Sequence, residues 1–255
     1  MSKKLQFSIL LLVLFVASCV SPKKITYFQD VDGIEVHDSI LNYEPKIQIG
    51  DMLRINVSAT DAEAAIPFNL YETPVVNNRG FSNLVPVEYI VNDSGEINFP
   101  ILGEIEVIGL TTSELTEKLE KLLSDGYIKD PVINLWITNF KINVLGEVKN
   151  PGAYVIKNSR VSVLEALSLA GDLTIHGNRA DVTLIRNQQG KKEFVKIDLR
   201  NKELFNSPYF YLVQNDVVYV SQNKAKVNSS AVGTHTAVII SSLSVLIALL
   251  AIVLK

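Results

Sequence analysis

Uncharged apolar runs lie at both ends of the chain, and they confine any water-soluble fold to the residues between them. The first run follows Lys3 and Lys4 and ends in small residues directly before Cys19, the only cysteine among the 255 residues. A basic start, a short apolar stretch and small residues before a cysteine are typical of a bacterial lipoprotein signal. We therefore expect residues 1–18 to be a cleaved signal peptide and Cys19 to carry the lipid. An ordinary cleaved signal that ends near a cysteine by chance is the alternative.

The second apolar run, residues 236–254, contains no charge. A helix of this length covers about 28 Å at 1.5 Å per residue, close to the ~30 Å hydrocarbon core of a bilayer. We expect a transmembrane helix, on which small and weakly polar residues share one face: Thr234, Ala237, Ser241, Ser244, Ala248 and Ala251. Such a stripe lets membrane helices pack closely or faces a lumen. Chance register in a lone tail is the alternative.

Composition and charge exclude several classes of protein. The formal net charge of -3 becomes -5 when the two signal lysines are removed, and no basic block remains, so nucleic acid is not an expected partner. His37, His176 and His235 are too far apart in the sequence to show metal-ligand spacing. No glycine loop of the phosphate-binding type is present. We therefore expect neither an enzyme nor a cofactor.

Four aspartates lie in turn contexts, where such a side chain usually binds its own backbone: Asp51, Asp93, Asp172 and Asp216.

Between the apolar ends the pattern predicts a polar tether over residues 19–43 and then two small α+β units in tandem. Capping boxes at Thr111–Glu114 and Ser162–Glu165 start helices, the first running to about residue 125 and the second ending at Gly171. The remaining elements are expected strands: 46–57 as a hairpin or a strand entered through a tight turn, a hairpin of 89–91 with 96–100, strands 132–137 and 141–145, a hairpin of 182–186 with 194–198, and a strand at 212–220.

Several of these strings resemble a known family. Residues 49–57, 95–103 and 107–111 are similar to the polysaccharide export domain of Wza-type outer-membrane lipoproteins. Residues 144–154, 164–171 and 215–220 resemble that family's SLBB module, a β-grasp-like fold. The expected organisation is a signal peptide, a lipidated tether, two domains, a linker and a transmembrane helix, at residues 1–18, 19–43, 44–138, 139–223, 224–235 and 236–254.

The resemblance implies an outer-membrane channel that exports capsular or exopolysaccharide through a homo-oligomeric ring, with its soluble domains in the periplasm. It also implies membrane lipid and the polysaccharide chain as partners, together with an inner-membrane polysaccharide co-polymerase or tyrosine autokinase, and no catalytic residues. The chain departs from the family pattern in two respects. It holds a single SLBB unit, which predicts a short periplasmic body, and its terminal run offers a lumen only the weakly polar stripe.

A lipoprotein adaptor that binds glycan or a partner without forming the pore is the alternative function. Exposed aromatic side chains would be its tool, because aromatic faces pack on sugar rings. Trp136 and the run Tyr209, Phe210 and Tyr211 are the candidates. Ordinary packing within strands is the competing explanation for these aromatics.

Overall fold

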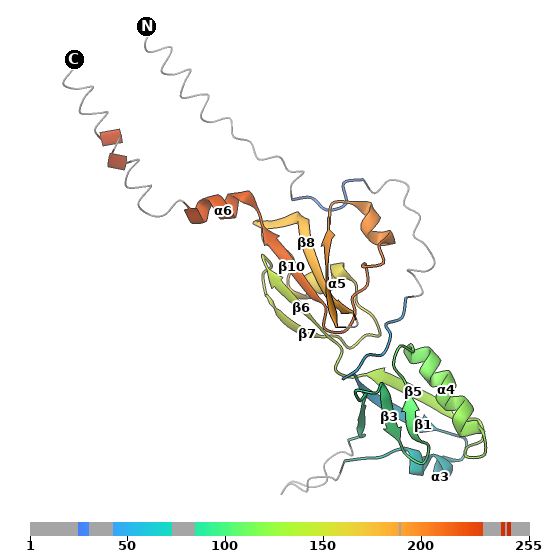
Figure 1. Cartoon of the computed structure of the whole chain (residues 1–255). Coiled ribbons are helices and arrows are strands. Elements are labelled where there is room, and N and C mark those ends of the chain that lie inside the picture. The colour runs from blue at the N-terminus through green and yellow to red at the C-terminus, as the bar shows by residue number, and fades with distance from the viewer. Residues whose placement is uncertain are drawn as a thin grey trace, which may run out of the picture.

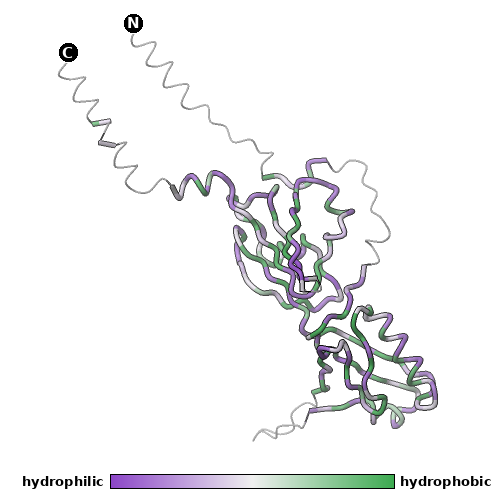
Figure 2. Tube along the Cα trace, in the orientation of Figure 1, coloured by the Kyte–Doolittle hydropathy of each residue, from purple (hydrophilic) through white to green (hydrophobic). Residues whose placement is uncertain are grey.

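A computed structural model describes residues 25–30, 43–72, 85–188, 190–231, 241–242 and 244–245 (Figure 1). These residues fold into two α+β domains in tandem, which confirms the expected two-domain architecture. Each domain has its own cluster of buried apolar side chains, and Ile137 packs against both clusters. Hydrophobic and hydrophilic residues alternate along many strands, as Figure 2 shows, because each sheet buries only one of its faces.

The first domain is built on a three-stranded antiparallel sheet of order β2-β1-β5, with a two-stranded hairpin beside it. Its elements are β1 Met52–Ser58, α3 Ala62–Ala65, the 3-10 helix η2 Ile66–Phe68, β2 Glu88–Ile90, β3 Glu96–Phe99, β4 Gly103–Glu106, α4 Thr112–Ser124 and β5 Val132–Ile137. β1 is entered through the turn at Gly50, so the tight-turn alternative is the one that forms.

Helix α4 covers one face of this sheet. Thr111 is its N-cap, and its hydroxyl and the Glu114 carboxylate exchange the two bonds of a capping box, as predicted. Leu115, Leu119 and Leu123 repeat every four residues and are fully buried. This spacing fixes α4 against the sheet and sets the groove described below.

The predicted hairpin of residues 89–91 with 96–100 is wrong, although its turn forms. The Asn92 carboxamide accepts from the Ser94 and Glu96 amides, and Gly95 adopts a φ of +82°. The strand before the turn pairs with β1, whereas β3 pairs with β4. A Cβ on Gly95 would lie 2.5 Å from the Ile108 side chain, so this turn packs against the residues after β4.

The second domain contains a five-stranded sheet of order β7-β6-β10-β8-β9, in which only β6 and β10 run parallel. Its elements are β6 Lys141–Gly146, β7 Gly152–Val155, α5 Val163–Leu169, β8 Gly177–Gln188, β9 Lys191–Ile197, the 3-10 helix η3 Lys202–Asn206, β10 Val217–Gln222 and α6 Lys224–Ala231. The predicted capping box at Ser162 and the β8–β9 hairpin are confirmed. Gly146 has a φ of +90°, and a Cβ there would meet the Val220 carbonyl oxygen at 2.1 Å.

Two flanking segments have more structure than the sequence predicts. Residues 25–30, expected within the tether, lie against the second domain, and the segment expected as a linker begins with α6. Figure 1 shows both at the end of the second domain that lies away from the first. Among the described residues, no helix combines the length and the apolar character needed to cross a bilayer.

Candidate functional site

Two side-chain amides connect the domains at their junction. Asn139 accepts from the Met52 amide and donates to the Gly50 carbonyl, both at 2.9 Å. Gln214, from the second domain, accepts from the Lys141 amide at 2.7 Å and donates to the Asn139 carbonyl at 2.9 Å. The short link between β5 and β6 is therefore bonded to the turns that open β1 and β10.

Asp51 lies in the turn beside this junction and is almost fully buried, at 1% exposure. Its Oδ2 accepts from the Gln48 amide at 2.8 Å, whereas Oδ1 has no hydrogen-bond partner within the part of the chain that the structure describes. Burial raises the pKa of Asp51 to about 6, and the Gln48 amide opposes this rise. The carboxyl can therefore gain or lose a proton under mildly acidic conditions.

Asp216 occupies the corresponding turn in the second domain, but it has a charged partner. Arg186 from β8 binds both carboxylate oxygens, with Nη2 at 2.7 Å from Oδ2, and also donates to the Tyr211 carbonyl at 2.9 Å. The two side chains are 6% and 1% exposed. Burial raises the pKa of Asp216, and the Arg186 guanidinium opposes this rise.

The segment 25–30 is held on the second domain by backbone and side-chain contacts. The amides of Phe28 and Gln29 donate to the carbonyls of Leu199 and Arg200. The Tyr27 hydroxyl donates to Asp172, and burial followed by this bond raises the pKa of the phenol. We call residues 25–30 the strap, because they fix the chain just after Cys19 to the second domain.

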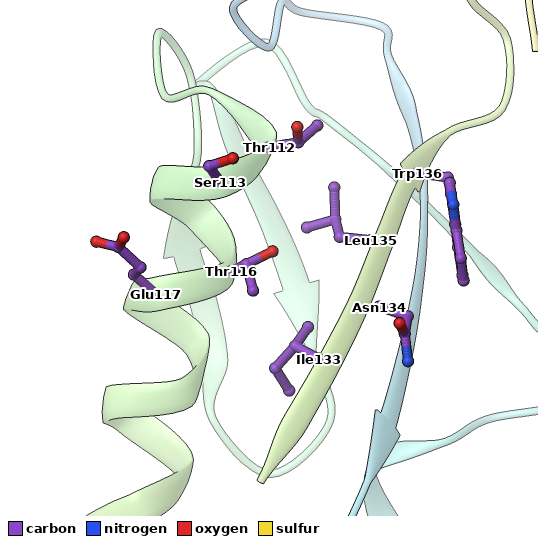
Figure 3. Close-up of a pocket in the computed structure, with 8 residues that line it drawn as sticks. All are labelled: Thr112, Ser113, Thr116, Glu117, Ile133, Asn134, Leu135 and Trp136. Carbon is purple, nitrogen blue, oxygen red and sulfur yellow. The ribbon is translucent and has the colours of Figure 1, made fainter. Parts of the chain in front are cut away.

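A groove of about 400 Å³ runs between the N-terminal half of α4 and strand β5 (Figure 3). β5 is an edge strand within the part of the chain that the structure describes, because β1 is its one partner there. Figure 3 shows Ile133 and Leu135 pointing toward α4, with Trp136 and Asn134 on the other side of the strand. Trp136 is 51% exposed, which is unusual for so large an apolar ring.

The four aromatic candidates for glycan contact have different environments. Trp136 is exposed, as a contact residue requires. Tyr209 and Phe210 pack against the second domain's core, and the Tyr209 hydroxyl donates to Glu193 at 2.6 Å. Tyr211 stacks on Tyr43 with ring centroids 5.1 Å apart. Residues 209–211 therefore pack against other parts of the protein, and Trp136 is the candidate that a glycan can reach.

Most of the predicted membrane residues lie outside the described ranges. These are Cys19, Thr234, Ala237, Ala248 and Ala251. Ser241 and Ser244 are described, and the Ser244 hydroxyl donates to the Ser241 carbonyl at 2.8 Å.

Three of the four turn aspartates bind nearby backbone as predicted. They are Asp51, Asp172 and Asp216. In the fourth turn Asn92, the neighbour of Asp93, makes the backbone bonds. Within the described ranges, no three His, Cys, Asp or Glu side chains gather as a metal site requires.

The structure thus defines a two-domain scaffold with a docked strap, a bonded junction and an edge-strand groove. Residues 41–138 match the family described as "Polysaccharide biosynthesis/export protein", and residues 140–220 match the SLBB domain. These two matches, together with the similarity to the EpsA and ExoF proteins described next, confirm the resemblance to the polysaccharide export family seen in the sequence.

Three curated proteins are similar to this chain in sequence. The EPS I polysaccharide export outer membrane protein EpsA of Ralstonia solanacearum is 30% identical over 172 residues, 64% of this chain and 44% of that protein. EpsA of Ralstonia nicotianae is 28% identical over 140 residues, 53% of this chain and 36% of that protein. The exopolysaccharide production protein ExoF of Rhizobium meliloti is 33% identical over 136 residues, 51% of this chain and 28% of that protein. The chain spans less than half the length of these relatives.

Proposed function

We propose that this chain is an outer-membrane lipoprotein that exports a capsular or exopolysaccharide from the periplasm to the cell surface. The observation that carries the proposal is the family's two domains, in tandem and in order, over nearly all described residues. The EpsA relatives are named as outer membrane proteins, which supports the outer membrane as its location. The chain acts as a conduit component and not as an enzyme.

The strap supports an orientation for the anchored protein. Tyr27 is eight residues after Cys19, so an extended chain between them spans at most about 28 Å. A lipid on Cys19 would hold the second domain close to the inner surface of the outer membrane. The first domain would then project into the periplasm toward the inner membrane, where a co-polymerase or tyrosine autokinase is the proposed partner.

In this proposal the working form is a closed ring of identical chains. Head-to-tail contacts between identical subunits either close into a ring or grow into a filament, and a membrane pore requires closure. Residues 236–254 cross the outer membrane and pack through the stripe that includes Ser241 and Ser244.

The test is to delete the gene and complement it with altered chains. The full chain should restore surface polysaccharide, whereas a chain ending at Ala231 should leave the polymer inside the cell, because it keeps both domains and α6 but lacks the proposed membrane helix. Cys19→Ser should also abolish export. Partial export by the shortened chain would favour the adaptor alternative, and normal export in the deletion strain would overturn the proposal.

A further inference from the structure

The three-stranded sheet of the first domain buries one face under α4. The other face is open among the described residues, because its side chains are exposed or half-buried. Alternate residues of β1 and β5 point to the open face, and the register places Arg54 beside Trp136 and Asn56 beside Asn134. Side chains opposite each other on neighbouring strands lie about 5 Å apart, and successive ones along a strand about 7 Å apart. The indole and the two carboxamides therefore form one small surface, which we call the open face.

The two asparagines of the open face differ from three asparagines in or next to the same domain, and they share their lack of carboxamide bonds with the exposed Asn98 of β3. Asn69, Asn92 and Asn139 use their carboxamides to bind backbone groups of turns and strands. Asn56 and Asn134 are exposed, and neither carboxamide bonds to another residue of the described part of the chain. Their donors and acceptors are available to a ligand.

The charge of the open face favours a ligand rich in hydroxyl groups. Its charged side chains are Arg54 and Glu88, which form an ion pair with Nη2 and Oε1 2.6 Å apart. The pair neutralises itself, so the surface offers no net charge to attract a phosphate or a charged peptide. A sugar hydroxyl both donates and accepts, as a carboxamide does, and the apolar face of a sugar ring packs on an indole.

The surface continues past the asparagines toward a second aromatic ring. Asn56 and Ser58 also border a hollow of about 270 Å³, which Tyr71 lines as well. Tyr71 is about half exposed.

We propose that the open face, formed by Trp136, Asn134 and Asn56, is a saccharide-binding site for a segment of the exported chain. This inference rests on the proposed function for the identity of its ligand. The indole stacks on one sugar ring, and the paired carboxamides bind the hydroxyls of that ring or the next. The competing occupant is a second copy of this chain packed on the same face.

Trp136 is the only tryptophan in the sequence, so its fluorescence reports directly on this site. The full lipidated chain, in a zwitterionic detergent without a sugar headgroup, is titrated with oligosaccharides released by mild acid from the producing strain's surface polysaccharide. We expect a saturable shift in emission. The double variant N56A/N134A should bind about 10-fold more weakly, since each lost hydrogen bond costs roughly a factor of 3. Asn158→Ala, an exposed asparagine of the second domain, is the matched control and should bind normally.

Calorimetry extends the test to the indole itself. Trp136→Phe should keep most of the affinity, and Trp136→Ala should lose roughly 3- to 10-fold, because the aromatic contact is removed. Circular dichroism checks that each variant folds. Absence of a saturable shift, or equal affinities across the variants, would overturn the inference. An emission change that follows protein concentration and not sugar would also overturn it, because it would place a second copy on the face.

The deletion strain separates this inference from the proposed function. If deletion abolishes export and no oligosaccharide shifts Trp136, only the binding site is wrong. If the deletion strain exports normally, the proposed function is wrong whatever the titration shows.

Discussion

The turn before β1 in the first domain and the turn before β10 in the second have the same hydrogen bonds, but the aspartates of the two turns have different surroundings. Before β1, the Asp51 amide donates to the Gln48 carbonyl at 3.1 Å, and the Asp51 carboxylate accepts from the Gln48 amide. Before β10, Asp216 makes the same two bonds with Val213. Asp216 also binds the Arg186 guanidinium, whereas Asp51 lies beside the domain junction and has no ion-pair partner among the described residues. The turn is local, but the charge state of its aspartate depends on a residue far away in the sequence.

The largest expected effect comes from breaking the ion pair of the second domain. Asp216→Asn keeps the shape of the side chain but leaves the buried Arg186 guanidinium without its counter-charge, which should lower the free energy of unfolding by about 3–5 kcal/mol. Urea unfolding followed by hydrogen exchange of second-domain amides measures it.

The matched control is Asp198→Asn in the same domain. Asp198 pairs with Arg200, but both side chains are 36% exposed, so this change should cost less than about 1 kcal/mol. If both variants lost the same unfolding free energy, burial would not determine how much an ion pair contributes to stability.

The second effect is a pH dependence in the first domain. A carboxyl whose pKa rises on folding holds its proton more tightly in the folded state. Asp51 therefore stabilises the fold fully at pH values below its ordinary pKa of 3.8. This contribution disappears as the pH rises through about 6, and amounts to about 3 kcal/mol. In Asp51→Asn this dependence should be absent.

Trp136 lies in the first domain, so its fluorescence follows the unfolding of that domain in urea at several pH values. The difference in unfolding free energy between the variant and the parent should grow in the variant's favour from pH 4 to pH 7. A difference that is constant with pH would contradict the raised pKa. Asp216→Asn should not produce this pH profile in the Trp136 signal.

A smaller effect is expected at the strap. Tyr27→Phe removes the hydroxyl that binds Asp172, which should weaken docking by about 1 kcal/mol. The amides of Phe28 and Gln29 should then exchange roughly 5-fold faster. Tyr127→Phe, at an exposed tyrosine of the first domain, should leave those rates unchanged. Unchanged exchange in Tyr27→Phe would show that the phenol does not hold the strap.

The smallest effect tests the turns themselves. Gly50 and Asn215 occupy the same position, with φ of +83° and +66°. Gly50→Asn should cost less than about 1 kcal/mol, because asparagine tolerates this conformation and a Cβ there meets no atom within 4 Å. Gly146→Asn should be far more destabilising, because of the close Val220 carbonyl. Thermal unfolding of the two variants makes the comparison.

Local chemistry explains what could be read from the sequence. The helix starts at Thr111 and Ser162 were predictable because each capping box needs only residues three positions apart. Strand pairing need not be local: residues 88–90 pair with β1, far earlier in the chain, and so the sequence suggested the wrong partner for them, while β3 pairs with the next strand. The Arg186–Asp216 pair joins residues 30 positions apart and has no sequence signature.

The sequence also could not show which of the aromatic candidates is exposed at the candidate site. Trp136 and the run 209–211 look alike as sequence, because an exposed and a packed aromatic use the same residue types. Only the fold separates them: Trp136 lies on an edge strand, whereas Tyr209 and Phe210 pack on the second core. The docking of the strap was missed because two aromatics in a polar stretch form no periodic pattern.

The most direct test of the export proposal is the mass of the lipidated full chain extracted in detergent, followed by particle averaging of the species found. We expect one large closed ring whose helices from residues 236–254 converge in the detergent belt, with the second domain next to the belt and the first domain farthest from it. A monomer or dimer would contradict the ring and indicate an anchored adaptor.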